Sequence, residues 1–183
     1  MVSSTSTGGR YGGLAQSFHW LTAILVLVAF IYGPGGSETR VYAPERDFDR
    51  QLHETLGLSV LLLSLVRLGW RALDRQPDPE PVPRWMGLAA KAVQHLLYLL
   101  LFAVPLTAIL GAWLQGHPVT WLGGAVGPWL APSHELGDNV AELHGLLGDA
   151  ILWVAGLHAA AALYHHYVLR DGVLRSMLPF GGR

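Results

Sequence analysis

Four of the nine histidines lie in long apolar stretches, at positions from which they could bind metal between helices. His19 and His53 each lie near the start of such a stretch, and His144 and His158 lie fourteen residues apart in the last one. Fourteen helical residues rise about 21 Å and turn roughly forty degrees short of four full turns, so His144 and His158 share a face at two depths. With antiparallel neighbours, His144 is level with His53 and His158 lies towards His19. The spacing predicts two pairs of histidines, one near each side of a membrane.

Neutral imidazole binds iron, copper and zinc, and a pair of histidines from facing helices can hold a haem iron from both sides. A flat macrocycle needs space beside each ligating helix, and the residue four positions further on lies on the same face as the histidine. That residue is small after all four of these histidines, and larger after the other five. The small residues are Ala23, Gly57, Gly148 and Ala162. We therefore interpret the four histidines as candidate haem ligands.

The other histidines have simpler explanations. His95 opens the third apolar stretch on the cytoplasmic side, and it is the alternative ligand for the inner site. His117 and His134 fall in an outer loop, where we expect them to be solvated. His165 and His166 lie near the end of the last stretch, where cationic groups suit the helix dipole. A single intramembrane histidine can also serve only to hydrogen-bond a neighbouring helix.

The elements that must position these histidines are membrane helices. The 183-residue chain is 51% apolar and 14% charged, against roughly 25% charged residues in an ordinary soluble domain. About 20 apolar residues cross the bilayer core as a helix, and four stretches qualify: about 14–32, 52–73, 91–114 and 141–169. We predict an all-α fold, an integral membrane four-helix bundle forming a single domain over residues 1–183. The first stretch also has the length of a secretory signal peptide, which is the alternative interpretation.

The basic residues predict the orientation of the bundle. If the amino terminus is cytoplasmic, nine of the twelve lysines and arginines lie on the cytoplasmic side, and only Arg40, Arg46 and Arg50 lie outside. This asymmetry follows the positive-inside rule and predicts that both termini are cytoplasmic. Within the last helix, Asp149 is expected to point away from the face that carries His144 and His158.

Composition excludes several other classes of function. The chain has no cysteine, which excludes disulfides, thiolate zinc sites, iron–sulfur clusters and the covalent attachment of c-type haem. Its formal net charge of -1 offers no basic face to nucleic acid. Any metal must be bound through nitrogen or oxygen.

The motifs around the candidate ligands resemble those of the bacterial cytochrome b561 family. They are residues 17–20 (SFHW), 52–54 (LHE), 144–145 (HG) and, most specifically, 156–167 (GLHAAAALYHHY). The resemblance extends over residues from about 11 to 179. It implies two haem b groups in the bacterial inner membrane, with His19 paired to His158 and His53 paired to His144. It also implies electron transfer from superoxide to ubiquinone, with release of molecular oxygen.

Under this interpretation, charged residues outside the ligand set have expected roles. Arg40, Arg46 or Arg50 would attract superoxide, although carboxylates in the same outer segment oppose them. On the inner side, haem propionates or lipid phosphates would pair with basic side chains; those residues are Arg67, Arg71, Arg84 and Lys91. Gln16 and His95 are weaker candidates for contact with the quinone. No residue is assigned a catalytic role.

Two other functions use the same residues. The first is a non-catalytic cytochrome subunit that connects a partner dehydrogenase or hydrogenase to the quinone pool. The second is a haem-free transporter or structural bundle whose histidines line a path for metal ions or protons. Haem absorption bands separate the transporter from the two cytochromes, because only the cytochromes contain haem.

Overall fold

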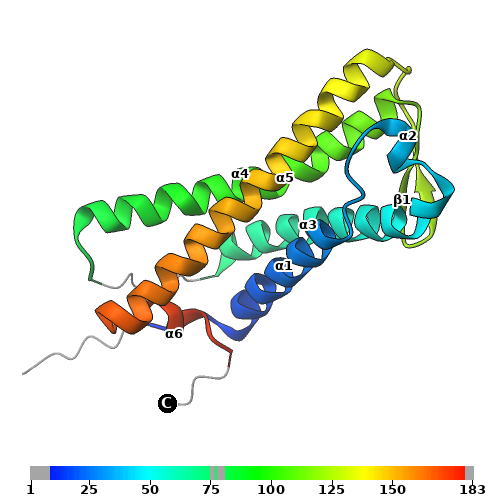
Figure 1. The fold of residues 1–183 in the computed structure, drawn as a ribbon. Helices are drawn as coiled ribbons and strands as arrows, with labels where there is room; N and C mark the ends of the chain where they lie inside the picture. Colours follow the sequence, from blue (N-terminus) through cyan, green and yellow to red (C-terminus); the bar gives the residue numbers. More distant parts are fainter. Residues whose placement is uncertain (1–8, 75–76, 78–80, 180–183) are drawn as a thin grey trace, which may run out of the picture.

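The computed structural model describes residues 9–74, 77 and 81–179, and long helices account for most of them (Figure 1). They are α1 (Gly13–Ile31), α3 (Asp47–Leu73), α4 (Arg84–Leu114) and α5 (His134–Tyr164), which a π-helical turn, η2 (His165–Leu169), continues. Each of the four is long and apolar enough to cross a membrane. The predicted all-α membrane bundle is therefore confirmed.

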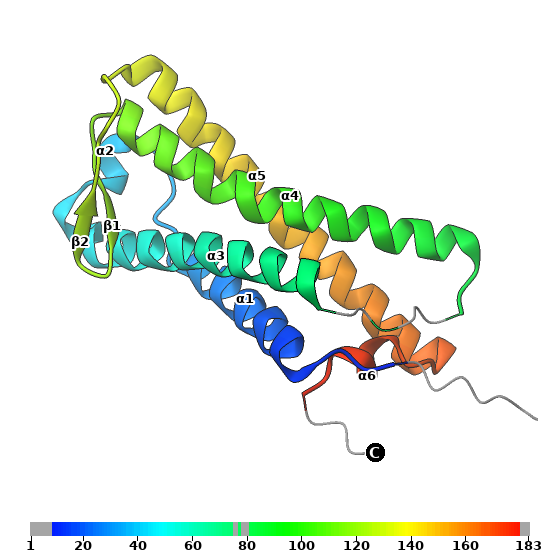
Figure 2. The same cartoon turned by 180° about the vertical axis from the view of Figure 1, so that it is seen from behind.

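Short elements close the two ends of the bundle. One end, called here the hairpin end, carries α2 (Glu38–Val41), the 3-10 turn η1 (Pro44–Arg46) and an antiparallel hairpin of β1 (Val119–Trp121) and β2 (Gly124–Val126). The other end, the terminal end, carries α6 (Val173–Met177) and the start of α1 (Figures 1 and 2).

The four helices pack as two pairs. α1 lies along α3, and α4 lies along α5, as both views show (Figures 1 and 2). α4 and α5 approach closely at Gly111, where a Cβ atom would lie 3.2 Å from the backbone nitrogen of Ala141. Small residues allow such contact between membrane helices. The side-chain core that joins the pairs consists of Val60, Leu100, Leu101 and Ile151.

The outward faces of the helices are apolar. Leu21, Ile24 and Leu27 of α1 and Leu157 of α5 are all about half exposed or more. A soluble protein rarely exposes so much contiguous apolar surface. In a bilayer these side chains contact acyl chains, while the helices satisfy their own backbone hydrogen bonds.

Three helices begin earlier than the apolar stretches suggested, at Asp47, Arg84 and His134 instead of about 52, 91 and 141. The added turns are polar, and hydropathy alone does not count them as part of a span. In α3 they are supported by Arg50, which pairs with Asp47 at 2.8 Å and with Glu54 at 3.1 Å. The membrane helices thus extend beyond the bilayer core at their ends.

The helices nearest the two ends of the chain, α1 and α6, meet at the terminal end. The Trp20 Nε1–H donates to the carbonyl of Met177 at 2.8 Å, and the Gln16 side-chain nitrogen donates to the carbonyl of Ser176 at 3.1 Å. Gln16 is buried and tethers α6 to α1 in this way. Arg75 and Arg183, two of the basic residues behind the predicted orientation, lie outside the described residues.

Candidate functional site

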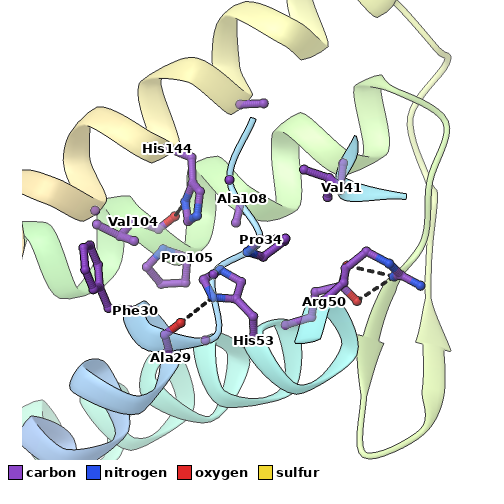
Figure 3. A pocket seen from close by; sticks show the side chains of 18 of the residues that line it. Ala29, Phe30, Pro34, Val41, Arg50, His53, Val104, Pro105, Ala108 and His144 are labelled. Atoms are coloured by element: carbon purple, nitrogen blue, oxygen red, sulfur yellow. Dashed lines mark hydrogen bonds and ion pairs between the residues drawn. The ribbon is translucent and has the colours of Figure 1, made fainter. Parts of the chain in front are cut away.

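His53 of α3 and His144 of α5 face each other across the space between the two helix pairs (Figure 3). Their ring centroids are 5.9 Å apart, and the ring planes are inclined at 82°. Both side chains are half-buried. Residues ninety-one positions apart in sequence therefore form the first of the two predicted pairs.

Backbone carbonyls orient both rings. His53 Nδ1 lies 2.7 Å from the carbonyl oxygen of Ala29, and His144 Nδ1 lies 2.9 Å from that of Val104. The Ala29 carbonyl is available because α1 ends at Ile31 and the Gly33 N–H bonds to Phe30 instead. A carbonyl only accepts, so each Nδ1 carries the proton and each Nε2 keeps a free lone pair. This tautomer is the one that binds a metal through Nε2.

A cavity of about 1090 Å³ surrounds this pair. Gly57 and Gly148 line it, and a Cβ atom at either would meet nothing within 4 Å. Cofactor sites typically occupy roughly 300–1,000 Å³, so the space suits a large flat group between the helix pairs. Asp149 also lines the cavity. The residue is exposed, and the direction expected for its side chain stays a prediction.

The second pair, His19 of α1 and His158 of α5, lies nearer the terminal end. Its ring centroids are 6.3 Å apart with an inclination of 69°. A cationic side chain, Arg67 of α3, lies beside this pair. Its Nη2 is 3.5 Å from His19 Nδ1, and its guanidinium is 5.4 Å from the ring centroid of Tyr98. The two pairs thus have different surroundings.

Both pairs have the separation that a shared metal requires. Two imidazole nitrogens each bound at about 2 Å to one ion put their ring centroids roughly 6 Å apart. Within residues 9–74 and 81–179, no group of three histidine, aspartate or glutamate side chains converges on a point. Each pair therefore offers two imidazole side chains, the number that a bis-histidine haem would need from the protein.

The remaining histidines are not brought to either pair. His95 is exposed, and its Nδ1 bonds to the carbonyl of Lys91 in its own helix at 2.7 Å. His165 donates from Nδ1 to Asp171 at 2.5 Å at the end of η2. His134 is exposed and begins α5.

His117 was expected to be solvated, and that expectation is wrong. Its ring stacks on Tyr42 with centroids 3.6 Å apart, and its Nε2 lies 2.8 Å from a carboxylate oxygen of Glu38. The hairpin strands and the segment before α3 fold over the cavity and bring these residues together. Sequence reasoning missed Tyr42 because it lies in a polar connection without a periodic pattern.

Two of the three arginines at the hairpin end, Arg46 and Arg50, are paired with acids. Arg50 lines the cavity, contacts both Asp47 and Glu54, and lies 5.1 Å from the Tyr42 ring centroid. Arg46 lies 3.5 Å from Asp49. Since the guanidinium groups of Arg46 and Arg50 each have a carboxylate beside them, the positive charge available at the hairpin end for attracting an anion is reduced.

Tyr42 is predicted to stay un-ionised far into the alkaline range. Burial raises the pKa of Tyr42 to about 12, and the carboxylates of Glu54 and Glu38 add to this. The unfolded chain ionises tyrosine at about pH 10, so the contribution of Tyr42 to stability is fully present below that pH and is lost as pH rises towards 12. Alkaline titration of phenolate absorbance should show a transition near pH 12 that is missing in Tyr42→Phe. Identical titration curves for the two proteins would contradict this.

A four-helix membrane bundle with histidine pairs facing one another in its core belongs to the class of bundles that can bind a metal or cofactor between facing helices. The family profile described as prokaryotic cytochrome b561 matches residues 10–180. The chain belongs to the prokaryotic cytochrome b561 family of bacterial membrane electron-transfer proteins, whose cofactor is haem b.

Similarity to individual members extends over nearly the whole chain. It is 32% identical to cytochrome b561 homolog 2 of Escherichia coli, over 97% of this chain and 95% of that protein. It is 33% identical to the probable superoxide oxidase CybB of Yersinia pestis, over 93% of this chain and 96% of that protein. It is also 33% identical to cytochrome b562 of Cereibacter sphaeroides, over 92% of this chain and 94% of that protein.

Proposed function

We propose that the protein binds two haem b groups and passes electrons from superoxide to ubiquinone. The axial ligands are His53 with His144 near the hairpin end and His19 with His158 near the terminal end. The observation that supports this most strongly is the presence of two imidazole pairs, 5.9 and 6.3 Å between centroids, each joining separate helices. Their separation by about 21 Å along α5 supports a position of one pair near each side of a membrane.

Haem b would supply reversible one-electron chemistry at iron, and ligation by two histidines would favour electron transfer over oxygen binding. The residues of the chain position the ligands. The carbonyls of Ala29 and Val104 accept the Nδ1 protons and so direct each Nε2 into the cavity. Gly57 and Gly148 leave the width that a macrocycle needs.

The net reaction balances as two superoxide anions giving up one electron each and becoming two molecules of oxygen. One ubiquinone takes up the two electrons with two protons and becomes ubiquinol. The superoxide step is supported by the name of the Yersinia pestis relative at 33% identity. The excess of basic residues at the terminal end supports a cytoplasmic position for that end in the inner membrane, with the hairpin end outside.

Basic residues at the terminal end are available to haem propionates and lipid phosphates. Arg84 and Lys91 are exposed on the first turns of α4, where their long side chains can reach the interface. Arg71 is half-buried on the last turn of α3. Together they favour anionic groups at this end.

A second candidate is a cytochrome subunit that receives electrons from a partner dehydrogenase or hydrogenase. The observation that favours it is the charge at the hairpin end, where three arginines are outnumbered by eight carboxylates. These carboxylates belong to Glu38, Glu45, Asp47, Asp49, Glu54, Glu135, Asp138 and Glu142. Such a surface does not attract a small anion, but a protein partner with complementary charge could dock on it.

Rapid mixing of the purified protein with superoxide in an anaerobic cell separates the two functions. The superoxide:quinone oxidoreductase should show haem reduction faster than spontaneous dismutation, followed by reoxidation when ubiquinone is added. Haem reduction far slower than dismutation would leave only the electron-carrier function.

The salt dependence of that reaction is a further prediction. Because carboxylates outnumber arginines at the hairpin end, the approach of superoxide is opposed electrostatically, and salt screens the repulsion. The rate of haem reduction should therefore rise about twofold between low and physiological ionic strength. A rate that falls with salt would show that Arg40, Arg46 or Arg50 attracts the anion, despite the pairs observed here.

A further inference from the structure

Arg67 is a cation within a membrane-spanning helix, and the proposed function has not used it. It follows His53 by fourteen residues on α3, the same spacing that separates His144 from His158 on α5. It therefore lies on the cavity-facing side of α3, about 21 Å from His53 and level with the second histidine pair. A charged side chain at this depth is costly, so a functional role is expected.

The charge of Arg67 has no anionic partner among the described residues. No carboxylate lies within ion-pair distance of it there, whereas Arg50 at the hairpin end contacts both Asp47 and Glu54. The contacts made by Arg67 are with His19, at 3.5 Å, and with the Tyr98 ring, at 5.4 Å from the centroid. Its side chain is half-buried. A full positive charge therefore acts on the second histidine pair in a medium of low dielectric constant.

The two histidine pairs differ in the charge that their Nδ1 atoms face. At the first pair, backbone carbonyls accept the Nδ1 protons of His53 and His144, which makes each imidazole a stronger electron donor to a metal. At the second pair, the Nδ1 of His19 faces a guanidinium. The 3.5 Å separation exceeds the usual range of about 2.7–3.2 Å for a hydrogen bond from nitrogen. The interaction is thus mainly one of charge.

We propose that Arg67 raises the reduction potential of the haem held by His19 and His158 above that of the haem held by His53 and His144. Oxidised iron carries one more positive charge than reduced iron, and a nearby cation that no described carboxylate neutralises disfavours the oxidised form. The carbonyl contacts at the first pair act in the other direction. The inner site is therefore the easier of the two to reduce. This inference rests on the proposed ligand pairs.

Optical redox titration of the purified two-haem protein tests the inference, with Arg67→Gln as the main variant. The higher of the two midpoint potentials should fall in Arg67→Gln, while the lower one stays constant. Arg67→Lys, which keeps the charge, should restore most of the lost potential. Arg175→Gln removes an exposed charge at the same end of the molecule and should leave both potentials unchanged.

Combination with a ligand variant assigns the shift to one haem. Arg67→Gln in the His144→Ala background should shift the single remaining potential, and in the His158→Ala background it should not. Unchanged potentials in Arg67→Gln with both haems retained would overturn the inference. If the Arg67→Gln variant loses the inner haem, the titration is repeated on the Arg67→Met variant. If both variants lose the inner haem while Arg67→Lys retains it, the inference is also overturned, because Arg67 then has a structural role. A wild-type protein without two haems would refute the proposed ligation instead.

Discussion

Replacing His144 with alanine should reduce the haem content of the purified protein from two haem b groups per chain to one. His144 and His53 face each other at 5.9 Å, and no other histidine approaches this pair within the described residues. Removing one imidazole leaves iron with a single axial protein ligand and deprives the macrocycle of its attachment to α5. His53→Ala should give the same loss, while His19 and His158 keep the second haem. The pyridine haemochrome assay on protein of known concentration measures the effect.

His134→Ala is the matched control, since His134 is exposed in the first turn of the same helix. It should retain both haems. His95→Ala tests the alternative inner ligand and should also retain both, because the His95 ring bonds to its own helix. Two low-spin haems in His144→Ala would exclude the proposed pairing. Loss of the inner haem in His95→Ala would replace one of the ligands assigned to it.

Replacing Gly148 with leucine should also remove the haem held by His53 and His144, here called the outer haem, although every histidine remains. Gly148 lines the cavity of about 1090 Å³ and has nothing within 4 Å of an added Cβ atom. A leucine side chain would occupy space between the helix pairs without clashing with protein, so the fold should persist while the macrocycle is excluded. The expected result is one haem per chain in a protein with unchanged helical content, measured by haem assay and circular dichroism.

Two controls distinguish exclusion of the haem from damage to a helix. Gly148→Ala adds one carbon and should retain both haems. Gly87→Leu on α4 places the same side chain where nothing lies within 4 Å, outside the cavity lining, and should also retain both. Full haem content in Gly148→Leu would mean that the outer haem does not occupy this cavity.

The sequence was sufficient to predict the four spans and the residues that face each other. Histidine pairs were predictable because helical spacing is regular: fourteen residues fix both the depth and the direction of His158 relative to His144. The small residues four positions after each histidine also have a structural counterpart at Gly57 and Gly148. These features depend on local helix geometry, which does not require knowledge of tertiary packing.

The hairpin end could not be predicted in this way. Its hairpin pairs Val119 with Val126, and the stacking of His117 on Tyr42 joins residues seventy-five positions apart. Neither contact is indicated by a periodic pattern of residues in the sequence.

The position of Arg67 in the sequence already indicates that it lies near a candidate ligand site. Its fourteen-residue spacing from His53 equals that between His144 and His158, and an arginine on the same face as a candidate ligand is informative. Its partner, however, comes from another helix, and the absence of a nearby carboxylate among the described residues depends on the packing of α1, α3 and α4. The sequence gives the depth of such a charge, whereas the structure gives its neighbours.

The most direct test of the two bis-histidine sites is the haem-to-protein ratio of the wild-type protein, measured together with its electron paramagnetic resonance spectrum. The pairs described here predict two haem b groups per chain, both low-spin because each iron has two axial imidazoles. A ratio of one or less in fully loaded protein, or a high-spin signal from either haem, would contradict them.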